Sequence, residues 1–309
     1  MLHLTTDSDG RDGGTISHEV RNEVHEVPLL TTAQAATVAE TEAQAPYYLP
    51  VRDEVEIFRA AYDRRIPVLL KGPTGCGKTR FVEHMAWLIA RERGHDPDGN
   101  LITVSCHDDL TAADLVGRYL LSADGTTWLD GPLTQAVRSG AICYLDEVVE
   151  ARKDTTVILH ALTDHRRMLP MERLGISVPA HPDFLLVVSY NPGYQSAAKD
   201  LKPSTRQRFM AIEFTYPGPD TEAEIIRHEA GTDERTARSL IFVGEQLRHL
   251  GEAGVIDGPS TRLLVHVGSL IADGIAPRRA CEVALVQALS DEADVQEAIR
   301  DVTDAVYVS

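Results

Sequence analysis

The sequence lacks any apolar run close to the roughly 20 residues that a membrane-spanning helix needs. Its first residues, MLHLTTDSDGRDGGT, contain neither the basic stretch nor the apolar stretch of a secretory signal. Cysteine is also scarce, and no two cysteines form a C-x-x-C pair; the four are Cys76, Cys106, Cys143 and Cys281. These absences argue against a disulfide framework and a cysteine zinc site. We expect a cytoplasmic protein with reduced thiols and no membrane insertion.

Positive charge is the next deficit. The 47 Asp and Glu outnumber the 30 Lys and Arg, which leaves a formal net charge of −17. Because a phosphate backbone is bound by a basic surface, nucleic acid is disfavoured as the main ligand. Residues 1–45 carry eight acidic side chains against Arg11 and Arg21, and residues 1–46 contain no aromatic side chain. Such a segment buries too little apolar surface to offset its ordering entropy, so we expect an acidic, disordered tail over 1–45.

From residue 46 onward, apolar runs with strand character alternate with helical patterns, which predicts a parallel sheet flanked by helices. The expected strands are PVLLKG, NLITVSC, GAICYLDE and DFLLVVSYN, and the first is followed by the helical pattern TRFVEHMAWLIARER. After EFTYPGPD the strands stop, and four segments with helical periodicity follow. The sequence therefore predicts an α/β core over residues 46–217, of the αβα P-loop type, and a small α-helical lid domain over 218–309.

The segment GPTGCGKT, residues 72–79, fits the pattern G-x-x-x-x-G-K-[ST] between a predicted strand and a predicted helix. Glycines let the backbone bend so that successive N–H groups cradle phosphate oxygens, and the start of the helix adds to that attraction. Lys78 would reach the β- and γ-phosphates of ATP, and the Thr79 hydroxyl would bind Mg²⁺. The predicted nucleotide-binding residues are Gly72, Pro73, Thr74, Gly75, Cys76, Gly77, Lys78, Thr79, Arg80 and Arg262.

The strand AICYLDE supplies a matching acidic pair. Asp146 would hold the Mg²⁺ through water, and Glu147 would orient and polarise the attacking water. A strand that ends in carboxylates at a helix start is the plain alternative. About 65 residues after a phosphate loop, the pair favours a nucleotide-binding site. A carboxylate beside the metal ligand also favours water as the phosphate acceptor, hence an NTPase and not a kinase.

Four further polar residues complete the predicted catalytic set. Asn191 ends another strand, where its amide could bond both the γ-phosphate and the attacking water, although Asn-Pro-Gly is also ordinary turn sequence. Arg206 and Arg208 precede a strand-like stretch and could stabilise transition-state charge. Arg262, at the start of a helix in the lid domain, could contact the nucleotide. The alternative for Arg206, Arg208 and Arg262 is that each is a solvated surface side chain. The predicted catalytic residues are Glu147, Lys78, Asn191, Arg208, Arg206 and Arg262.

These motifs, in this order, resemble the AAA+ ATPases. Two stretches look like hairpins of the MoxR group: GRYLLSADGTTWLDGPL, within the second helix of the core, and RRMLPMERLGISVPAHPDF, before the Asn191 strand. A capping box at Thr111 and Asp114 marks the start of that second helix. Four blocks, including CHDDLTAADLVGRYLL and SYNPGYQSAAKDLKPSTRQRF, look like the CbbQ/NirQ/NorQ family. The resemblance covers about residues 46–309 and leaves the tail outside.

The resemblance implies a ring, commonly a hexamer, with ATP and Mg²⁺ between neighbouring subunits. Arg208, or as the second choice Arg206, would enter the neighbour's site as an arginine finger. Family members act with a von Willebrand A-domain adaptor on a client enzyme. CbbQ-like members reactivate Rubisco, and NorQ-like members help mature nitric oxide reductase. The segment YYLPVRDEVEIFRAAYDRRIPVLLKG looks more CbbQ-like, so a Rubisco-type client is slightly favoured.

Three functional classes fit a phosphate loop at this point. An ATP-driven remodelling motor uses the whole motif set. A small-molecule kinase would need an acceptor pocket and usually lacks groups such as Asn191 and Arg262. A scaffold that binds ATP without productive hydrolysis would have no use for Glu147. The motor is the preferred hypothesis.

Overall fold

The computed structural model describes residues 45–122, 125–192, 201–252 and 258–307. Apart from Ala45, the predicted tail lies outside this range. Residues 193–200, which belong to the block SYNPGYQSAAKDLKPSTRQRF, also lie outside it.

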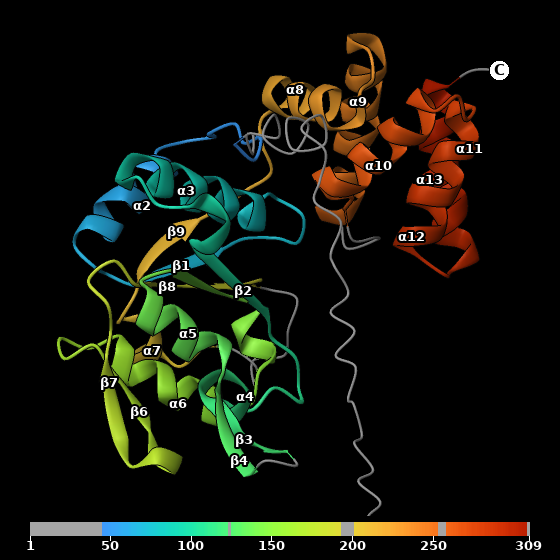
Figure 1. Ribbon diagram of the computed structural model, residues 1–309. Helices are drawn as coiled ribbons and strands as arrows, with labels where there is room; N and C mark the ends of the chain where they lie inside the picture. The colour runs from blue at the N-terminus through green and yellow to red at the C-terminus, as the bar shows by residue number, and fades with distance from the viewer. Residues whose placement is uncertain (1–44, 123–124, 193–200, 253–257, 308–309) are drawn as a thin grey trace, which may run out of the picture. The chain divides into compact units, whose positions relative to one another are not determined.

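A five-stranded parallel sheet forms the centre of the N-terminal part, in the order β2-β5-β8-β1-β9 (Figure 1). The strands are β1 (Val68–Lys71), β2 (Leu101–Ser105), β5 (Ile142–Asp146), β8 (Leu185–Tyr190) and β9 (Met210–Glu213). The four strands expected from apolar runs are present, and the strand-like stretch after Arg208 is the fifth. The predicted α/β P-loop fold with a parallel sheet is confirmed.

Both faces of this sheet are covered, which explains why its strands read as continuous apolar runs. Because successive side chains point to opposite faces, Val68 and Leu70 join one buried cluster and Leu69 joins the other. Helices α2 (Glu54–Asp63) and α3 (Lys78–Arg93) supply the first cluster. The second is supplied by α4 (Ala112–Val116), α5 (Pro132–Ser139) and α6 (Lys153–Leu162). The core thus has three layers.

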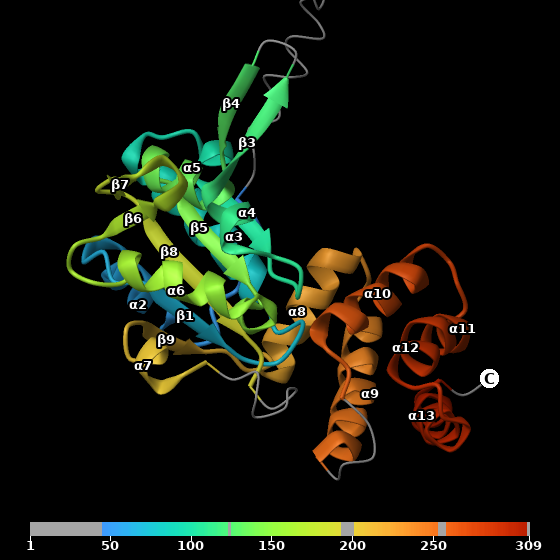
Figure 2. The ribbon, with the colours of Figure 1, turned by 90° about the horizontal axis from the view of Figure 1, so that it is seen from below.

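Two antiparallel hairpins interrupt the core where the sequence predicted them. The first consists of β3 (Gly117–Ser122) and β4 (Gly125–Asp130), directly after α4, and it projects away from the central sheet in Figure 2. The second consists of β6 (Met168–Met171) and β7 (Ile176–Pro179). The Thr111–Asp114 capping box begins α4 as expected, with the Thr111 hydroxyl accepting from the Asp114 N–H.

Every element after β9 is helical in the described part of the chain. The helices are α8 (Pro219–Ala230), α9 (Glu234–Glu252), α10 (Thr261–Ala272), α11 (Pro277–Cys281), α12 (Gln287–Leu289) and α13 (Ala293–Val306), with a π-helical turn at Glu282–Val286. They share a separate apolar cluster that includes Leu240, Leu264 and Ile299. Short elements elsewhere are α7 (Pro203–Arg206) and the 3₁₀ turns Pro97–Gly99, Val148–Glu150 and Glu172–Leu174. Among the described residues, no helix combines the length and hydropathy needed to cross a membrane.

A buried ion pair joins the first three of these helices. The Glu222 side chain on α8 is 1% exposed, and both of its oxygens accept from the Arg248 guanidinium of α9, at 2.6 and 2.8 Å. Oε1 also accepts from the Thr261 hydroxyl of α10, at 2.6 Å. Both oxygens of the buried carboxylate are therefore hydrogen-bonded and its charge is paired, as a charge removed from water requires.

We predict that Glu222→Gln lowers the free energy of unfolding by about 3 kcal/mol, because it leaves a mostly buried guanidinium without its counter-charge. Urea denaturation monitored by circular dichroism measures the change. Asp220→Asn is the matched control, since Asp220 makes the exposed pair of the same two helices, with Arg238. Its expected cost is below about 1 kcal/mol. Equal losses of unfolding free energy in the two variants would contradict the stabilising role of the buried Glu222–Arg248 pair.

Candidate functional site

The register of the parallel strands brings the predicted site residues to one edge of the sheet. Lys71 at the end of β1 pairs with Tyr190 at the end of β8, and Leu145 of β5 pairs with Val188 of β8. The residues that follow these strands are therefore neighbours. They are the phosphate loop after β1, Asp146 at the end of β5 with Glu147 directly after it, and Asn191 directly after β8. Ligands of open α/β sheets bind in this position, outside the carboxyl ends of the strands.

The phosphate loop passes from β1 into α3 with a backbone that requires glycine. Gly77 precedes α3 in a left-handed conformation, with φ of 98°. Gly75 has φ of 69°, and a Cβ added there would lie 2.5 Å from the Cβ of Ser260, at the start of α10. A side chain at either position would therefore strain the backbone, and at Gly75 it would also collide with α10.

Lys78 is buried, and its ammonium group bonds three oxygens. Nζ donates to the Gly72 and Pro73 carbonyls of the loop, at 2.7 and 2.8 Å, and to Asn191 Oδ1, at 2.7 Å. Burial lowers the pKa of Lys78, while the nearby carboxylates of Asp146 and Glu147 act in the opposite direction. These three bonds satisfy the ammonium, which is held at the loop where a phosphate group would bind.

The Asn191 amide links three parts of the site. Besides accepting from Lys78, it donates through Nδ2 to Thr74 Oγ1 and to Glu147 Oε1, both at 3.1 Å. The bond with Lys78 identifies the carbonyl oxygen of the amide, because an ammonium only donates. Asn191 thus holds the predicted base, the predicted phosphate-binding lysine and the phosphate loop in one arrangement.

Asp146 is fixed by two hydroxyl groups that sequence reasoning missed. Its Oδ1 accepts from Tyr144, at 2.7 Å, and from Ser189. Its Oδ2 lies 3.4 Å from the Thr79 hydroxyl, the other predicted Mg²⁺ ligand. Burial raises the pKa of Tyr144, which keeps its hydroxyl a donor. The outer hydrogen bonds orient the carboxylate toward Thr79, as second-sphere groups do at metal sites.

Glu147 has a left-handed backbone, with φ of 55° and ψ of 46°. This conformation is uncommon for a residue other than glycine, asparagine or aspartate. It is held in place because the Glu147 N–H donates to Ser189 Oγ, at 3.0 Å. The turn directs the carboxylate to Asn191 and the cavity that contains the phosphate loop.

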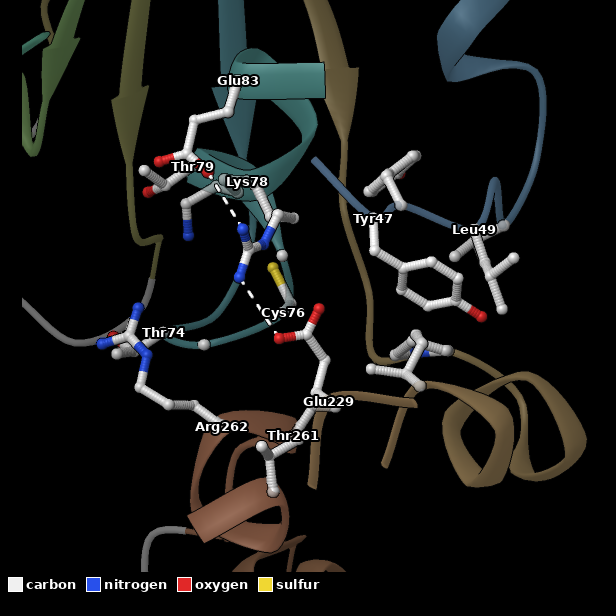
Figure 3. Close-up of a pocket in the computed structure, with 18 of the residues that line it drawn as sticks. Tyr47, Leu49, Thr74, Cys76, Lys78, Thr79, Glu83, Glu229, Thr261 and Arg262 are labelled. Carbon is white, nitrogen blue, oxygen red and sulfur yellow. Dashed lines mark hydrogen bonds and ion pairs between the residues drawn. The ribbon is translucent and has the colours of Figure 1, made fainter. Parts of the chain in front are cut away.

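That cavity has a volume of about 540 Å³, within the usual range of about 300–1,000 Å³ for small-molecule sites. Figure 3 shows its lining from the phosphate loop, from α10 and from the segment before α2. Sequence reasoning assigned no site role to that last segment, where Tyr47, Tyr48 and Leu49 line the cavity. The Tyr48 hydroxyl donates to Glu54, at 2.7 Å, and the Tyr47 ring stacks on His228 of α8, with centroids 3.5 Å apart.

The predicted nucleotide-binding residues lie in or beside this cavity. Cys76 lines it, and burial raises the pKa of its thiol, so no reactive thiolate is indicated. Arg80 lines it and forms ion pairs with Glu83, at 3.5 Å, and Glu229, at 3.3 Å. Arg262 reaches toward Thr74 from α10 (Figure 3).

Arg206 and Arg208 are not brought to the cavity. Both precede β9, and Met210 at the start of β9 pairs with Val68 at the start of β1. The two arginines therefore lie at the amino edge of the sheet, whereas the phosphate loop follows the carboxyl edge. Four residues of strand, about 13 Å, separate these edges. Arg208 is exposed.

The residues present fit a magnesium nucleotide. Hard oxygen groups of Thr79 and Asp146 suit Mg²⁺, which usually takes one or two protein ligands together with water and phosphate oxygens. The glycine-rich turn, the ammonium of Lys78 and the start of α3 suit a phosphate chain.

Comparison with known proteins agrees with this geometry. Residues 67–209 match the family model described as AAA domain (dynein-related subfamily), and residues 222–306 match the one described as CbbQ/NirQ/NorQ C-terminal. The fold and the site therefore define an AAA-type P-loop ATPase domain, a class that hydrolyses ATP and binds it with Mg²⁺.

Three relatives are similar over most of their length. Protein CbbQ of Hydrogenophilus thermoluteolus is 58% identical, over 85% of this chain and 95% of that protein. Protein NorQ of Paracoccus denitrificans is 52% identical, over 89% and 99%. The denitrification regulatory protein NirQ of Pseudomonas aeruginosa is 54% identical, over 84% and 96%. The chain belongs to the CbbQ/NirQ/NorQ family, which confirms the resemblance noted in its motifs.

We predict that Lys78→Ala and Glu147→Gln separate binding from hydrolysis. Lys78→Ala removes the ammonium and should abolish ATP binding. Glu147→Gln keeps an oxygen that accepts from Asn191 but loses the basic carboxylate. It should bind ATP and lower turnover by about 10²- to 10⁴-fold. Titration with a fluorescent ATP analogue and a phosphate-release assay measure the two properties. Unchanged turnover in Glu147→Gln would refute the role of Glu147 as the base.

Proposed function

We propose that this protein is a ring-forming ATPase that uses hydrolysis to remodel a client enzyme, together with an adaptor. The observation that carries the ATPase assignment is the Asn191 amide, which joins the Lys78 ammonium to the Glu147 carboxylate. A base held beside a phosphate-binding lysine is placed to activate water at the γ-phosphate.

In this mechanism, Glu147 accepts a proton from the water whose oxygen attacks the γ-phosphorus. The bond from the γ-phosphorus to the bridging oxygen breaks, and ADP leaves with the electron pair. Lys78 stabilises the negative charge that develops on the phosphate oxygens, and Arg262 assists from α10. Mg²⁺, held by Thr79 and through water by Asp146, would neutralise charge on the β- and γ-phosphates. Asn191 orients Glu147.

Two other functional classes receive less support. A small-molecule kinase needs an acceptor hydroxyl near the γ-phosphate, yet Glu147 and Asn191 occupy the lining there. A scaffold that binds ATP without hydrolysis would not need a carboxylate held in a left-handed turn. The remodelling ATPase accounts for both features.

Ring formation is supported by the separation of Arg208 from the cavity of its own chain. An exposed guanidinium at the amino edge of the sheet can serve a nucleotide only on another subunit. We assign Arg208 as the finger that acts on the neighbour. Arg206 is the second choice, since it is less exposed. A hexamer is the ring size that we propose.

The proposed adaptor is a von Willebrand A-domain protein. For the client, the higher identity to CbbQ, 58% against 52% for NorQ, slightly favours a Rubisco-type enzyme. A NorQ-like role in maturing nitric oxide reductase, or another metalloenzyme, is the alternative. The proposed location is the cytoplasm, and neither nucleic acid nor membrane insertion is part of the proposal.

We predict that Arg208→Ala subunits are inactive alone, with a loss of about 10³-fold or more for an arginine finger. Mixed with Glu147→Gln subunits, they should regain part of the activity. In a mixed ring, Arg208 of a Glu147→Gln subunit can then reach a site whose own Glu147 is intact, on an Arg208→Ala subunit. Phosphate release from mixtures of fixed total concentration tests this expectation. Full activity of Arg208→Ala alone would transfer the role to Arg206, for which the same mixing experiment applies.

We also predict that Glu147→Gln protein held in ATP retains its adaptor and client. Affinity capture from source cells followed by mass spectrometry identifies them, with Lys78→Ala as the control that cannot form the ATP state. Recovery of a von Willebrand A-domain protein with Rubisco supports the favoured client. Recovery with nitric oxide reductase subunits supports the alternative. ATP turnover that depends on a small metabolite, without a captured partner, would replace the motor with a transferase.

A further inference from the structure

The first turn of α10 carries Arg262. The ion pair of Glu222 and Arg248 holds this turn through two residues that precede Arg262, Pro259 and Thr261. The Pro259 carbonyl accepts from Arg248 Nε, at 3.0 Å. The Thr261 hydroxyl donates to Glu222 Oε1, at 2.6 Å, and Arg248 donates to both oxygens of Glu222. A displacement of Arg248 or Glu222 would therefore move the backbone on which Arg262 stands.

The same turn lies against the phosphate loop. Ser260 caps the start of α10, with its Oγ accepting from the Leu263 N–H at 3.3 Å. Its side chain occupies the space where a Cβ on Gly75 would lie, only 2.5 Å from the Ser260 Cβ. Contact at Gly75 makes the position of α10 sensitive to the conformation of the loop that binds phosphate.

The Arg248 guanidinium makes contacts through its N–H donors and also through its planar face. Two nitrogens bond Glu222, the third bonds the Pro259 carbonyl, and the guanidinium lies 4.2 Å above the centre of the Tyr216 ring. Its side chain is 16% exposed. A lysine could place a charge here, but it has neither the fork of donors nor the planar face. The site therefore requires arginine for its geometry, and not only for its charge.

Tyr216 completes the connection to the phosphate loop. It lies between β9 and α8, and its hydroxyl donates to the Thr74 carbonyl, at 3.2 Å. Thr74 also accepts from Asn191 through its hydroxyl. A continuous series of contacts thus runs from Thr74 through Tyr216 and Arg248 to the start of α10.

We propose that Tyr216, Arg248 and Glu222 are positioning residues for Arg262, which set its guanidinium at the γ-phosphate according to the state of the phosphate loop. The inference deepens the proposed ATPase function and rests on it. Because Arg262 would meet a group that ATP has and ADP lacks, these residues raise the preference for ATP over ADP.

Tyr216→Phe is the sharpest test, because it removes one hydroxyl and keeps the ring beneath Arg248. Kd values for ATP and ADP are measured in the Glu147→Gln background, for Tyr216→Phe, Arg262→Ala and the double variant. Tyr216→Phe should weaken ATP binding about 3- to 10-fold, as expected for one hydrogen bond, and leave ADP binding within about 2-fold. With Arg262→Ala present, it should have no further effect on ATP, since coupled residues are not additive.

Arg248→Lys should give the same selective loss and the same dependence on Arg262. Arg238→Lys is the matched control, because Arg238 also joins α9 to α8, through Asp220 at 3.1 Å, but on an exposed surface. Its nucleotide affinities should not change. Equal losses for ATP and ADP, or losses that add to that of Arg262→Ala, would overturn the positioning role. Wild-type protein that binds ATP yet releases no phosphate would refute the ATPase function, while the binding comparison in the Glu147→Gln background would still decide the positioning role.

Discussion

The arrangement of the site depends on one amide group at the end of β8. Asn191 accepts from Lys78 and donates to Thr74 and Glu147, so the phosphate loop and the proposed base are held by a single side chain. The three bonds form because parallel strands of matched register bring their carboxyl ends together. Sheet topology is thus the constraint, and the chemistry at the cavity follows from it.

Sequence alone predicted the parts of the site whose geometry is local. The phosphate loop is eight consecutive residues with a strand before and a helix after, and its spacing leaves few conformations. Asp146, Glu147 and Asn191 could be predicted because each follows an apolar strand of a sheet expected to be parallel. Ser189 could not, because its contact with Asp146 comes from the pairing of β5 with β8 and joins residues 43 apart in the sequence. Tyr144 was missed although its contact is local: it lies two residues before Asp146 on β5, and the alternation of side chains along a strand places both on one face. Only the register shows that the buried Ser189 hydroxyl faces the carboxylate predicted to hold Mg²⁺.

The fold was predicted with similar limits. Strands and hairpins of the core were expected where they occur, whereas no helix was assigned to α2 or α13. In α13 the signal is present, since Val295, Ile299 and Val302 recur at helical spacing and belong to or pack on the apolar cluster of the C-terminal helices. The Tyr47–Leu49 segment carries no motif. Its place beside the cavity arises from contacts with Glu54 and His228, which lie 6 and about 180 residues away. Tertiary packing of that kind leaves no local pattern.

The left-handed backbone of Glu147 affects which substitutions the chain can accept in evolution. Such a conformation costs a residue of this type of order 1 kcal/mol or more, and asparagine or glycine adopts it more easily. Substitutions at this position that relieve the strain are therefore expected to stabilise the fold while they remove the proposed base. If Glu147 is the base, stability and turnover are opposed at one residue, and selection for stability alone would favour a protein that binds ATP without hydrolysing it.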